Sequence, residues 1–175
     1  MRTTVYVGTS LDGFIARKDG DIDWLVKYQN KDVHNSYNEF IKRIDAMVIG
    51  RRTFEKVLSF PEWPYEKKVF VLSTTLNQIP ETLNKRATLL SMKPAALLNY
   101  ISDQGFSNLY IDGGKVIQSF LKEDLIDELI ITRVPELIGT GIPLFGFLDN
   151  DLQFEHILTN IYSDGLVNSH YKRKR

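Results

Sequence analysis

The sequence contains no cysteine, which excludes disulfide bridges, thiolate metal sites and cysteine nucleophiles. It has no net charge, because 22 basic residues balance 22 acidic ones, so no overall field draws it to nucleic acid or to a membrane surface. No apolar run is long enough to span a bilayer, and residues 1–7 lack the apolar segment of a signal peptide. We therefore expect a soluble cytoplasmic protein that binds neither nucleic acid nor membrane.

What is present is ordinary for a globular protein, with 43% hydrophobic and 25% charged residues in a chain of 175. That length favours a single domain over residues 1–175, with a core large enough to need no covalent staples. The sequence shows no repeat, low-complexity linker or break in composition that would divide it.

Short apolar segments rich in β-branched residues alternate with amphipathic segments over most of the chain. Strands are predicted at 3–7, 45–50, 68–75, 87–90, 109–111 and 125–134, and helices at 30–44, 51–58, 94–104 and 115–122. Irregular loops are expected at 17–23 and 135–147, and Ser163-Asp164-Gly165 predicts a closing hairpin between 151–162 and 166–172. The predicted class is α/β, with a mixed, mostly parallel central sheet flanked by helices and a C-terminal antiparallel hairpin.

The segment from Leu109 to Leu121 carries the clearest functional signal. A buried strand is followed by Asp112, Gly113 and Gly114, and a helix begins at once. Backbone N–H groups and the positive end of a helix dipole then point at one spot, where no Cβ hinders an anion. A diphosphate would fit there, although paired glycines also serve simply as a tight connection.

Two other strand ends carry groups that suit phosphate. They are followed by Gly50, Arg51, Arg52 and Thr53 in one case and by Ser73, Thr74 and Thr75 in the other. Since the carboxyl ends of parallel strands meet along one rim, guanidinium, hydroxyl and helix-start N–H groups would gather in one cleft. Each set also has a plainer explanation, because arginines in a first turn can be solvated and hydroxyls can cap a turn.

Six segments in this order resemble the dihydrofolate reductase-like superfamily, and within it the C-terminal domain of the bifunctional riboflavin-biosynthesis deaminase/reductase (RibD). The resemblance runs from Val5 to about Lys172. Its markers are SLDGFIA at 10–16, IGRRTFE at 49–55, VLSTT at 71–75, IDGGK at 111–115, GTGIPLF at 139–145 and the Asp164-Gly165 hairpin.

The resemblance implies NADPH as the cofactor, spread along the rim. Ile15 and Ala16 would pack on the nicotinamide, and Gly50, Arg51, Arg52 and Thr53 would hold phosphates. Ser73 and Thr74 would lie by the 2′-phosphate, and the diphosphate would lie at Gly113, Gly114, Lys115 and Val116. The family often has a cis peptide between the paired glycines, so one is expected at Gly113–Gly114. Relatives of the riboflavin type commonly form homodimers, for which the apolar segment 138–148 is the candidate contact.

On the acceptor side, Asp112 stands where riboflavin-type relatives carry an acid. It is the candidate catalytic residue, for proton transfer or for orienting a sugar hydroxyl, with capping of the next helix as the alternative. Trp24, Tyr37 and Thr132 are candidate substrate residues, although aromatic side chains fill the core by default. The carboxylate of folate-reducing relatives falls near Gln29, which is not an acid.

The remaining polar residues suggest no further chemistry. The histidines (His34, His156 and His170) stand singly without the spacing of metal ligands, so no metal site is expected. Asp12 is expected to bond its own backbone, and the basic tail 172–175 to be solvated.

The leading interpretation is an NADPH-dependent reductase that passes a hydride to a small heterocyclic or sugar-like acceptor, resembling 5-amino-6-(5-phosphoribosylamino)uracil reductase. Two alternatives stay open: dihydrofolate reductase activity, and a non-catalytic nucleotide-binding or scaffold protein.

Overall fold

The computed structural model describes residues 1–175. Its strands are β1 (Arg2–Thr9), β2 (Phe14–Ala16), β3 (Ala46–Gly50), β4 (Lys68–Leu72), β5 (Ala87–Leu90), β6 (Asn108–Asp112), β7 (Glu128–Arg133), β8 (Ile142–Pro143), β9 (Phe154–Ile161) and β10 (Val167–Arg173). Its helices are α1 (Asp23–Val26), α2 (Lys31–Lys42), α3 (Arg51–Leu58), α4 (Pro94–Ser102) and α5 (Gly114–Lys122), with 3-10 turns η1 (Glu81–Leu83) and η2 (Ser163–Gly165). None of the helices combines the length and apolar character needed to cross a bilayer.

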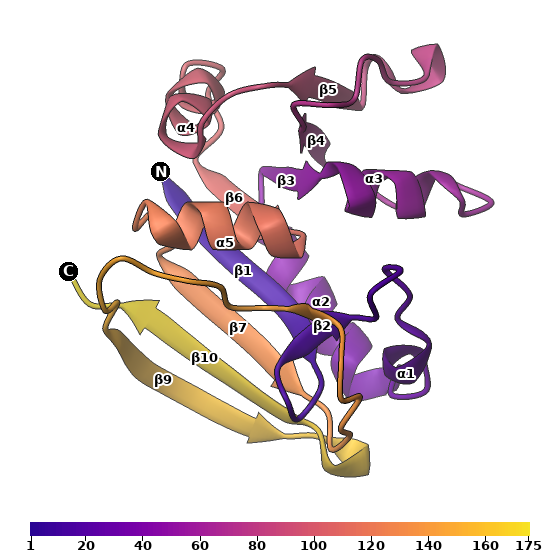
Figure 1. Ribbon diagram of the computed structural model, residues 1–175, viewed down its shortest axis with the longest axis vertical. Helices are drawn as coiled ribbons and strands as arrows, with labels where there is room; N and C mark the ends of the chain where they lie inside the picture. Colours follow the sequence, from indigo (N-terminus) through magenta and orange to yellow (C-terminus); the bar gives the residue numbers. More distant parts are fainter.

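Eight of the strands form one sheet in the order β5-β4-β3-β6-β1-β7-β10-β9 (Figure 1). The strands from β5 to β7 run parallel, whereas β10 is antiparallel to both β7 and β9. The predicted mixed sheet with a closing antiparallel hairpin is therefore confirmed. The hairpin extends the sheet at one edge, so β9 has a neighbour on one side only.

Each face of the sheet carries its own hydrophobic cluster because strand residues alternate between the faces. Leu109 and Ile111 of β6 pack in the cluster that includes α4 and α5 residues. Tyr110, between them, packs in the other cluster, where Phe40 of α2 stacks on Tyr6 at a centroid distance of 4.7 Å. The faces of the sheet are thus distinct, and α2 and α3 contribute to the one that carries Tyr110.

Two short strands were not expected from the sequence: β2, just before the predicted loop at 17–23, and β8, within the predicted loop at 135–147. Phe14 of β2 pairs with Pro143 of β8, which joins the segment after β1 to the segment after β7. Asp12 strengthens this junction, because its carboxylate accepts hydrogen bonds from the backbone N–H of Gly139 (2.8 Å) and Ile138 (3.3 Å). Asp12 therefore has the structural role expected of it, although its strongest backbone partner lies 127 positions away and not in its own turn.

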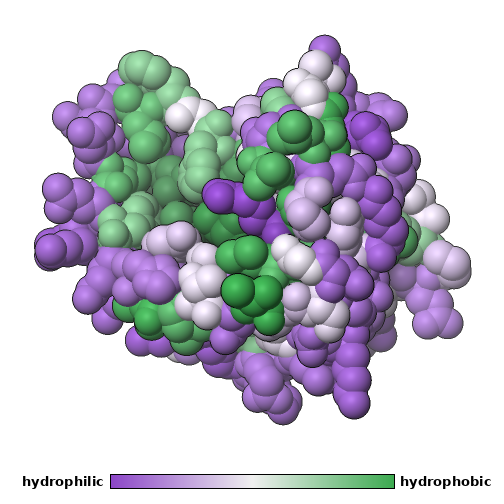
Figure 2. Space-filling model, turned by 90° about the horizontal axis from the view of Figure 1, so that it is seen from below, coloured by the Kyte–Doolittle hydropathy of each residue, from purple (hydrophilic) through white to green (hydrophobic).

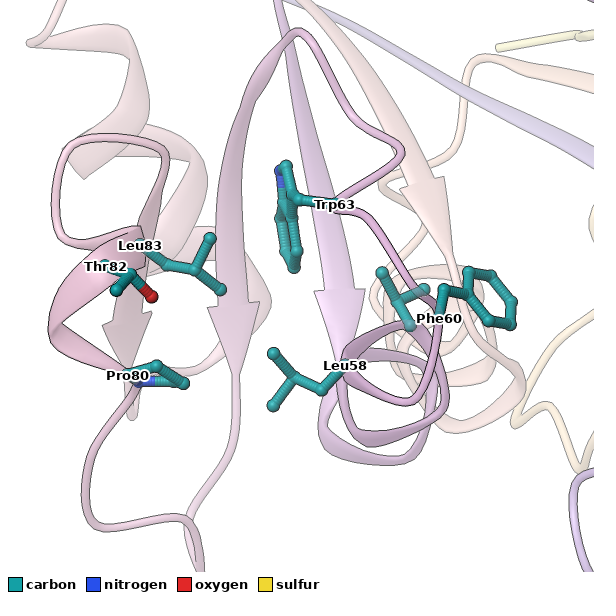
Figure 3. A pocket seen from close by; sticks show the side chains of 7 residues that line it. Leu58, Phe60, Trp63, Pro80, Thr82 and Leu83 are labelled. Carbon is teal, nitrogen blue, oxygen red and sulfur yellow. The ribbon is translucent and has the colours of Figure 1, made fainter.

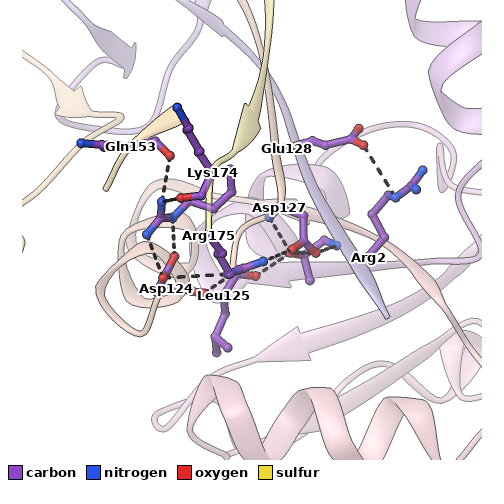
Figure 4. Close-up of polar contacts among 10 residues, drawn as sticks. Arg2, Asp124, Leu125, Asp127, Glu128, Gln153, Lys174 and Arg175 are labelled. Atoms are coloured by element: carbon purple, nitrogen blue, oxygen red, sulfur yellow. Dashed lines mark hydrogen bonds and ion pairs between the residues drawn. The ribbon is translucent and has the colours of Figure 1, made fainter. Parts of the chain in front are cut away.

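The basic tail is paired with acidic side chains. Arg173 donates to the two carboxylate oxygens of Asp124 at 2.7 and 3.0 Å, and Arg175 donates to Asp127 (Figure 4). Asp127 also accepts the backbone N–H of Thr3 at 2.9 Å. The expectation of a merely solvated tail was wrong, because these contacts fasten the end of β10 to the turn before β7.

Candidate active site

The three predicted phosphate-binding segments lie at one rim of the sheet. β4, β3 and β6 are adjacent and parallel, with Gly50 level with Leu72 and Ile49 level with Asp112. Segments 50–53, 73–75 and 113–116 follow directly at these carboxyl ends. The topological part of the prediction is therefore confirmed, and the rim is the place where an open parallel sheet binds ligands.

The starts of α3 and α5 meet through glycines. Gly113 has φ of +92°, and a Cβ at this position would lie 2.8 Å from Oγ1 of Thr53 and 3.4 Å from the backbone N of Gly50. Neither helix has a side-chain cap, because Gly50 and Gly113 occupy the N-cap positions. The first-turn N–H groups of both helices therefore have no capping side chain, which leaves them available to an anion.

The turn at the paired glycines does not use a cis peptide. All peptide bonds in the chain are trans, so the expected cis bond between Gly113 and Gly114 was wrong. The positive φ of Gly113, which glycine adopts without a steric cost, makes the turn instead.

Exposed cationic side chains surround these helix starts. Arg51 makes only a surface ion pair, from Nη1 to Oε1 of Glu55 at 3.4 Å, while Arg52 and Lys115 are exposed without an ion pair. A surface pair within one helix contributes about 0.3–0.5 kcal/mol, so Arg51 can exchange Glu55 for a phosphate at little cost.

Ser73 and Thr74 differ in how their hydroxyls are used. Oγ of Ser73 is buried and accepts hydrogen bonds from the backbone N–H of Thr75 (3.2 Å) and Leu76 (3.0 Å). The Ser73 side chain thus shapes the turn, as the plainer explanation held. Thr74 is exposed at the rim, and its cofactor role stays a prediction.

An apolar surface lies next to the start of α5. A Cβ on Gly114 would lie 3.1 Å from Cδ1 of Ile15 and 2.9 Å from Cγ2 of Ile142. Ile15 is half-buried, and Ala16 beside it is buried. The β2–β8 ribbon thus brings Ile15 close to the glycine turn, where a flat ring attached to a diphosphate could pack.

Asp112 ends β6 on the sheet face that also carries Tyr110. Burial raises the pKa of its carboxyl to about 6, opposed by a hydrogen bond from the backbone N–H of Gly113 to Oδ1 at 2.7 Å. That N–H belongs to the N-cap residue, so Asp112 does not cap α5 in the usual way. A carboxyl with a raised pKa at a strand end is suited to proton transfer.

Of the candidate substrate residues, only Tyr37 is both partly exposed and influenced by the charge of Asp112. Its phenol is half-buried on α2, and its pKa is raised by burial and then by the charge of Asp112. Trp24 is 2% exposed and packs with Val134 and Leu166, while Thr132 is buried and accepts a 2.8 Å hydrogen bond from Nδ2 of Asn168. The structure therefore does not bring Trp24 or Thr132 to an open acceptor surface, because tertiary packing covers both.

One residue at this site was missed by the sequence analysis. Burial raises the pKa of Tyr65, and the charge of Asp112 is the second cause. Tyr65 lies in the connection between α3 and β4, where Pro61 and Pro64 remove any helical or strand periodicity. No local pattern could therefore have marked it.

Two recesses lie away from this rim. A polar one of about 270 Å³ is lined by Arg17, Lys18, Asp19 and Thr140. An apolar one of about 200 Å³ lies between the end of α3 and η1 (Figure 3), lined by Val57, Leu58, Phe60, Trp63, Pro80, Thr82 and Leu83. Neither is lined by Asp112 or by the glycine turn.

Comparison with known proteins gives four informative similarities. Residues 3–165 match the RibD C-terminal domain. The crystal structure of a putative riboflavin biosynthesis protein from Shewanella sp. PV-4 is 45% identical, with a TM-score of 0.94 and full coverage of both chains. A diaminohydroxyphosphoribosylaminopyrimidine deaminase/5-amino-6-(5-phosphoribosylamino)uracil reductase from Thermotoga maritima is 15% identical, with a TM-score of 0.76 over 99% of this chain and 56% of that one. Dihydrofolate reductase from Enterococcus faecalis, complexed with NADP(H), is 17% identical, with a TM-score of 0.72 over 99% and 97% of the two chains. The last two show that the fold is dihydrofolate reductase-like.

Proposed function

The chain belongs to the RibD C-terminal domain family, and from this premise we propose that it is an NADPH-dependent reductase acting on a small heterocyclic or sugar-like acceptor. The observation that carries the proposal is the meeting of the α3 and α5 helix starts at Gly113, with Arg51 and Arg52 beside them. Two uncapped helix starts and exposed guanidinium groups on one rim suit a ligand with several phosphates.

The groups along the rim suit the successive parts of this cofactor. Thr53, Gly113 and Gly114 would hold the diphosphate, and Arg51 and Arg52 would pair with phosphates. Thr74 would lie near the 2′-phosphate, and Ile15 would support the nicotinamide ring. Bound NADPH would supply the hydride, so the chain itself must position the acceptor and control a proton.

Asp112 is the proposed proton source. With a pKa of about 6, roughly a tenth of these carboxyls are protonated at neutral pH. A neutral carboxyl in a half-buried site can donate its proton as the acceptor gains negative charge, and the Gly113 N–H then stabilises the carboxylate that remains.

Replacing Arg51 tests the assignment of the cofactor. We assign Arg51 to the additional 2′-phosphate that only NADPH carries, so Arg51→Ala should weaken binding of NADPH more than binding of NADH. Arg86→Ala is the matched control, since Arg86 is also exposed but lies at the opposite end of the neighbouring strands. Calorimetric titration of both nucleotides gives the comparison, and equal weakening of the two would refute the assignment.

The acceptor separates the proposed reductase from the two alternatives. Oxidation of NADPH is followed with dihydrofolate and with the phosphoribosylaminouracil substrate of the riboflavin-type reductase. Rapid oxidation by dihydrofolate would favour dihydrofolate reductase activity, although Gln29 stands where folate-reducing relatives carry an acid. Binding of NADPH without oxidation by any acceptor would favour a scaffold.

A homodimer is proposed as the assembly. Exposed apolar side chains gather on the final hairpin and the segment before it: Phe145, Phe147, Ile157, Leu158, Ile161 and Val167. Figure 2, which views the molecule from below relative to Figure 1, shows hydrophobic residues lining a hollow of the surface. An unpaired edge strand with exposed apolar residues is a typical interaction site. Ile161→Lys should therefore shift a dimer toward monomer in analytical ultracentrifugation, and an unchanged mass would contradict this interface.

The cytoplasmic location stays a prediction.

A further inference from the structure

Tyr65 places a half-buried phenol near Asp112 on a ring that apolar packing holds in position. The ring lies edge-on to Trp63 at a centroid distance of 5.3 Å, and Trp63 in turn lies 6.0 Å from Phe54 of α3. Tyr65 also packs against the cluster that contains Ile49 and Tyr110. Packing therefore fixes the Tyr65 ring, and with it the hydroxyl, although Tyr65 lies in an irregular connection.

Tyr65 and Asp112 are on the same side of the sheet. Tyr110 belongs to the cluster that Tyr65 contacts, and Asp112, two residues further along β6, faces the same way. Ile49, also in that cluster, is level with Asp112 on β3. Burial and the charge of Asp112 both raise the pKa of Tyr65, in agreement with this placement.

Only some phenols around Asp112 are used by the protein itself. The hydroxyl of Tyr110 donates to the carbonyl oxygen of Tyr6 at 2.8 Å, and that of Tyr6 donates to Oγ of Ser36 at 3.0 Å. The hydroxyls of Tyr37 and Tyr65 make no hydrogen bond within the protein. Neither hydroxyl is among the fully buried polar atoms that lack a partner, so each reaches the surface and can donate to a bound ligand.

We propose that Tyr65, acting with Tyr37, determines acceptor specificity by donating a hydrogen bond to a carbonyl oxygen of a heterocycle held against Asp112. The inference rests on the proposed reductase function, because it identifies part of the acceptor side of the same site. Tyr37 comes from α2 and Tyr65 from the connection after α3, so the two hydroxyls approach from separate segments. A site built to donate such bonds rejects an analogue that lacks the acceptor atom.

Tyr65→Phe is the test, because it removes the hydroxyl and keeps the ring against Trp63. The probe is 5,6-diaminouracil, titrated calorimetrically into the full-length protein saturated with NADP⁺. Loss of one hydrogen bond should weaken probe binding about fivefold to tenfold. Tyr100→Phe is the matched control, since Tyr100 lies on α4, contacts Phe70 of the other cluster, and should leave the affinity unchanged.

Analogues of the probe that lack the 2- or the 4-carbonyl identify the bond. The wild-type protein should bind one of these analogues more weakly than it binds 5,6-diaminouracil. Tyr65→Phe should bind that analogue and 5,6-diaminouracil with equal affinity. The proposal is overturned if the wild-type protein does not bind the probe, if Tyr65→Phe binds it as the wild type does, or if that variant loses NADP⁺ affinity to the same extent. Failure of the proposed function is distinguishable, because it would appear as absence of nicotinamide nucleotide binding by the wild-type protein.

Discussion

Replacing Asp112 with asparagine should stabilise the protein in neutral and alkaline solution while lowering its activity. The pKa of this carboxyl is raised from 3.8 to about 6, so the folded protein binds its proton more tightly than the unfolded chain does. The contribution of Asp112 to the free energy of unfolding is therefore fully present below about pH 4, where the carboxyl is protonated in both states. That contribution is lost as the pH rises through 6.

The size of the effect follows from the shift. Each pKa unit corresponds to about 1.36 kcal/mol, so a shift from 3.8 to about 6 corresponds to a cost of roughly 3 kcal/mol for the ionised form. Asparagine cannot ionise, and its Oδ1 can still accept the N–H of Gly113. The gain of Asp112→Asn in free energy of unfolding should rise from near zero at about pH 4 to about 3 kcal/mol at about pH 8.

Urea unfolding of both proteins across this pH range measures the gain. Asp45→Asn is a control of opposite sign: burial opposes the shift, but hydrogen bonds from Ser107 and Asn108 hold the pKa of Asp45 below its usual value. That variant should be destabilised at neutral pH, with the loss fading in acid. A gain for Asp112→Asn that does not depend on pH, or a loss at about pH 8, would refute the reasoning. Asp112→Asn should also keep its affinity for NADPH but lose turnover.

Three further changes test other parts of the structure. Gly113→Ala should lower the free energy of unfolding by about 1–3 kcal/mol and weaken NADPH binding, because the added Cβ would meet Thr53 at a φ of +92°. Gly139→Ala is the control, because Gly139 has a φ of +75° but open space around it. That variant should lose stability but keep its affinity for NADPH. Thr132→Val should cost about 1–3 kcal/mol in urea unfolding by leaving the buried Asn168 amide unpaired, and Thr132→Ser should restore most of it; equal losses would contradict the role of this bond. Asp21→Asn, which breaks an exposed 3.4 Å pair with Lys56, should change stability by less than about 0.5 kcal/mol, and a larger loss would mean that the loop is held more firmly than this contact suggests.

The rim could be predicted from the sequence because its signals are local. Buried strands ending at Gly50, at Leu72 and before Gly113 are visible as apolar runs, and in two cases a helix begins at the next residues. Parallel strands then place their ends together as a matter of topology. The gathering of segments 50–53, 73–75 and 113–116 needed no knowledge of side-chain contacts.

The acceptor side could not be predicted in the same way, because it depends on contacts between distant segments. Tyr65 meets the face of Asp112 through packing on Trp63, and the burial of Trp24 depends on Val134 and Leu166. Strands β2 and β8 have three and two residues, too few to show a period. The four basic residues 172–175 likewise could not indicate which acidic side chains they would pair with.

The central claim is that the carboxyl-end rim of β3, β4 and β6 binds a phosphorylated nicotinamide dinucleotide. Calorimetric titration of the wild-type protein with NADPH, followed by the same titration of Gly113→Ala, tests it most directly. We expect saturable binding of one NADPH per chain that Gly113→Ala abolishes and Gly139→Ala retains. Absence of binding to the wild-type protein, or binding that Gly113→Ala leaves unchanged, would contradict the claim.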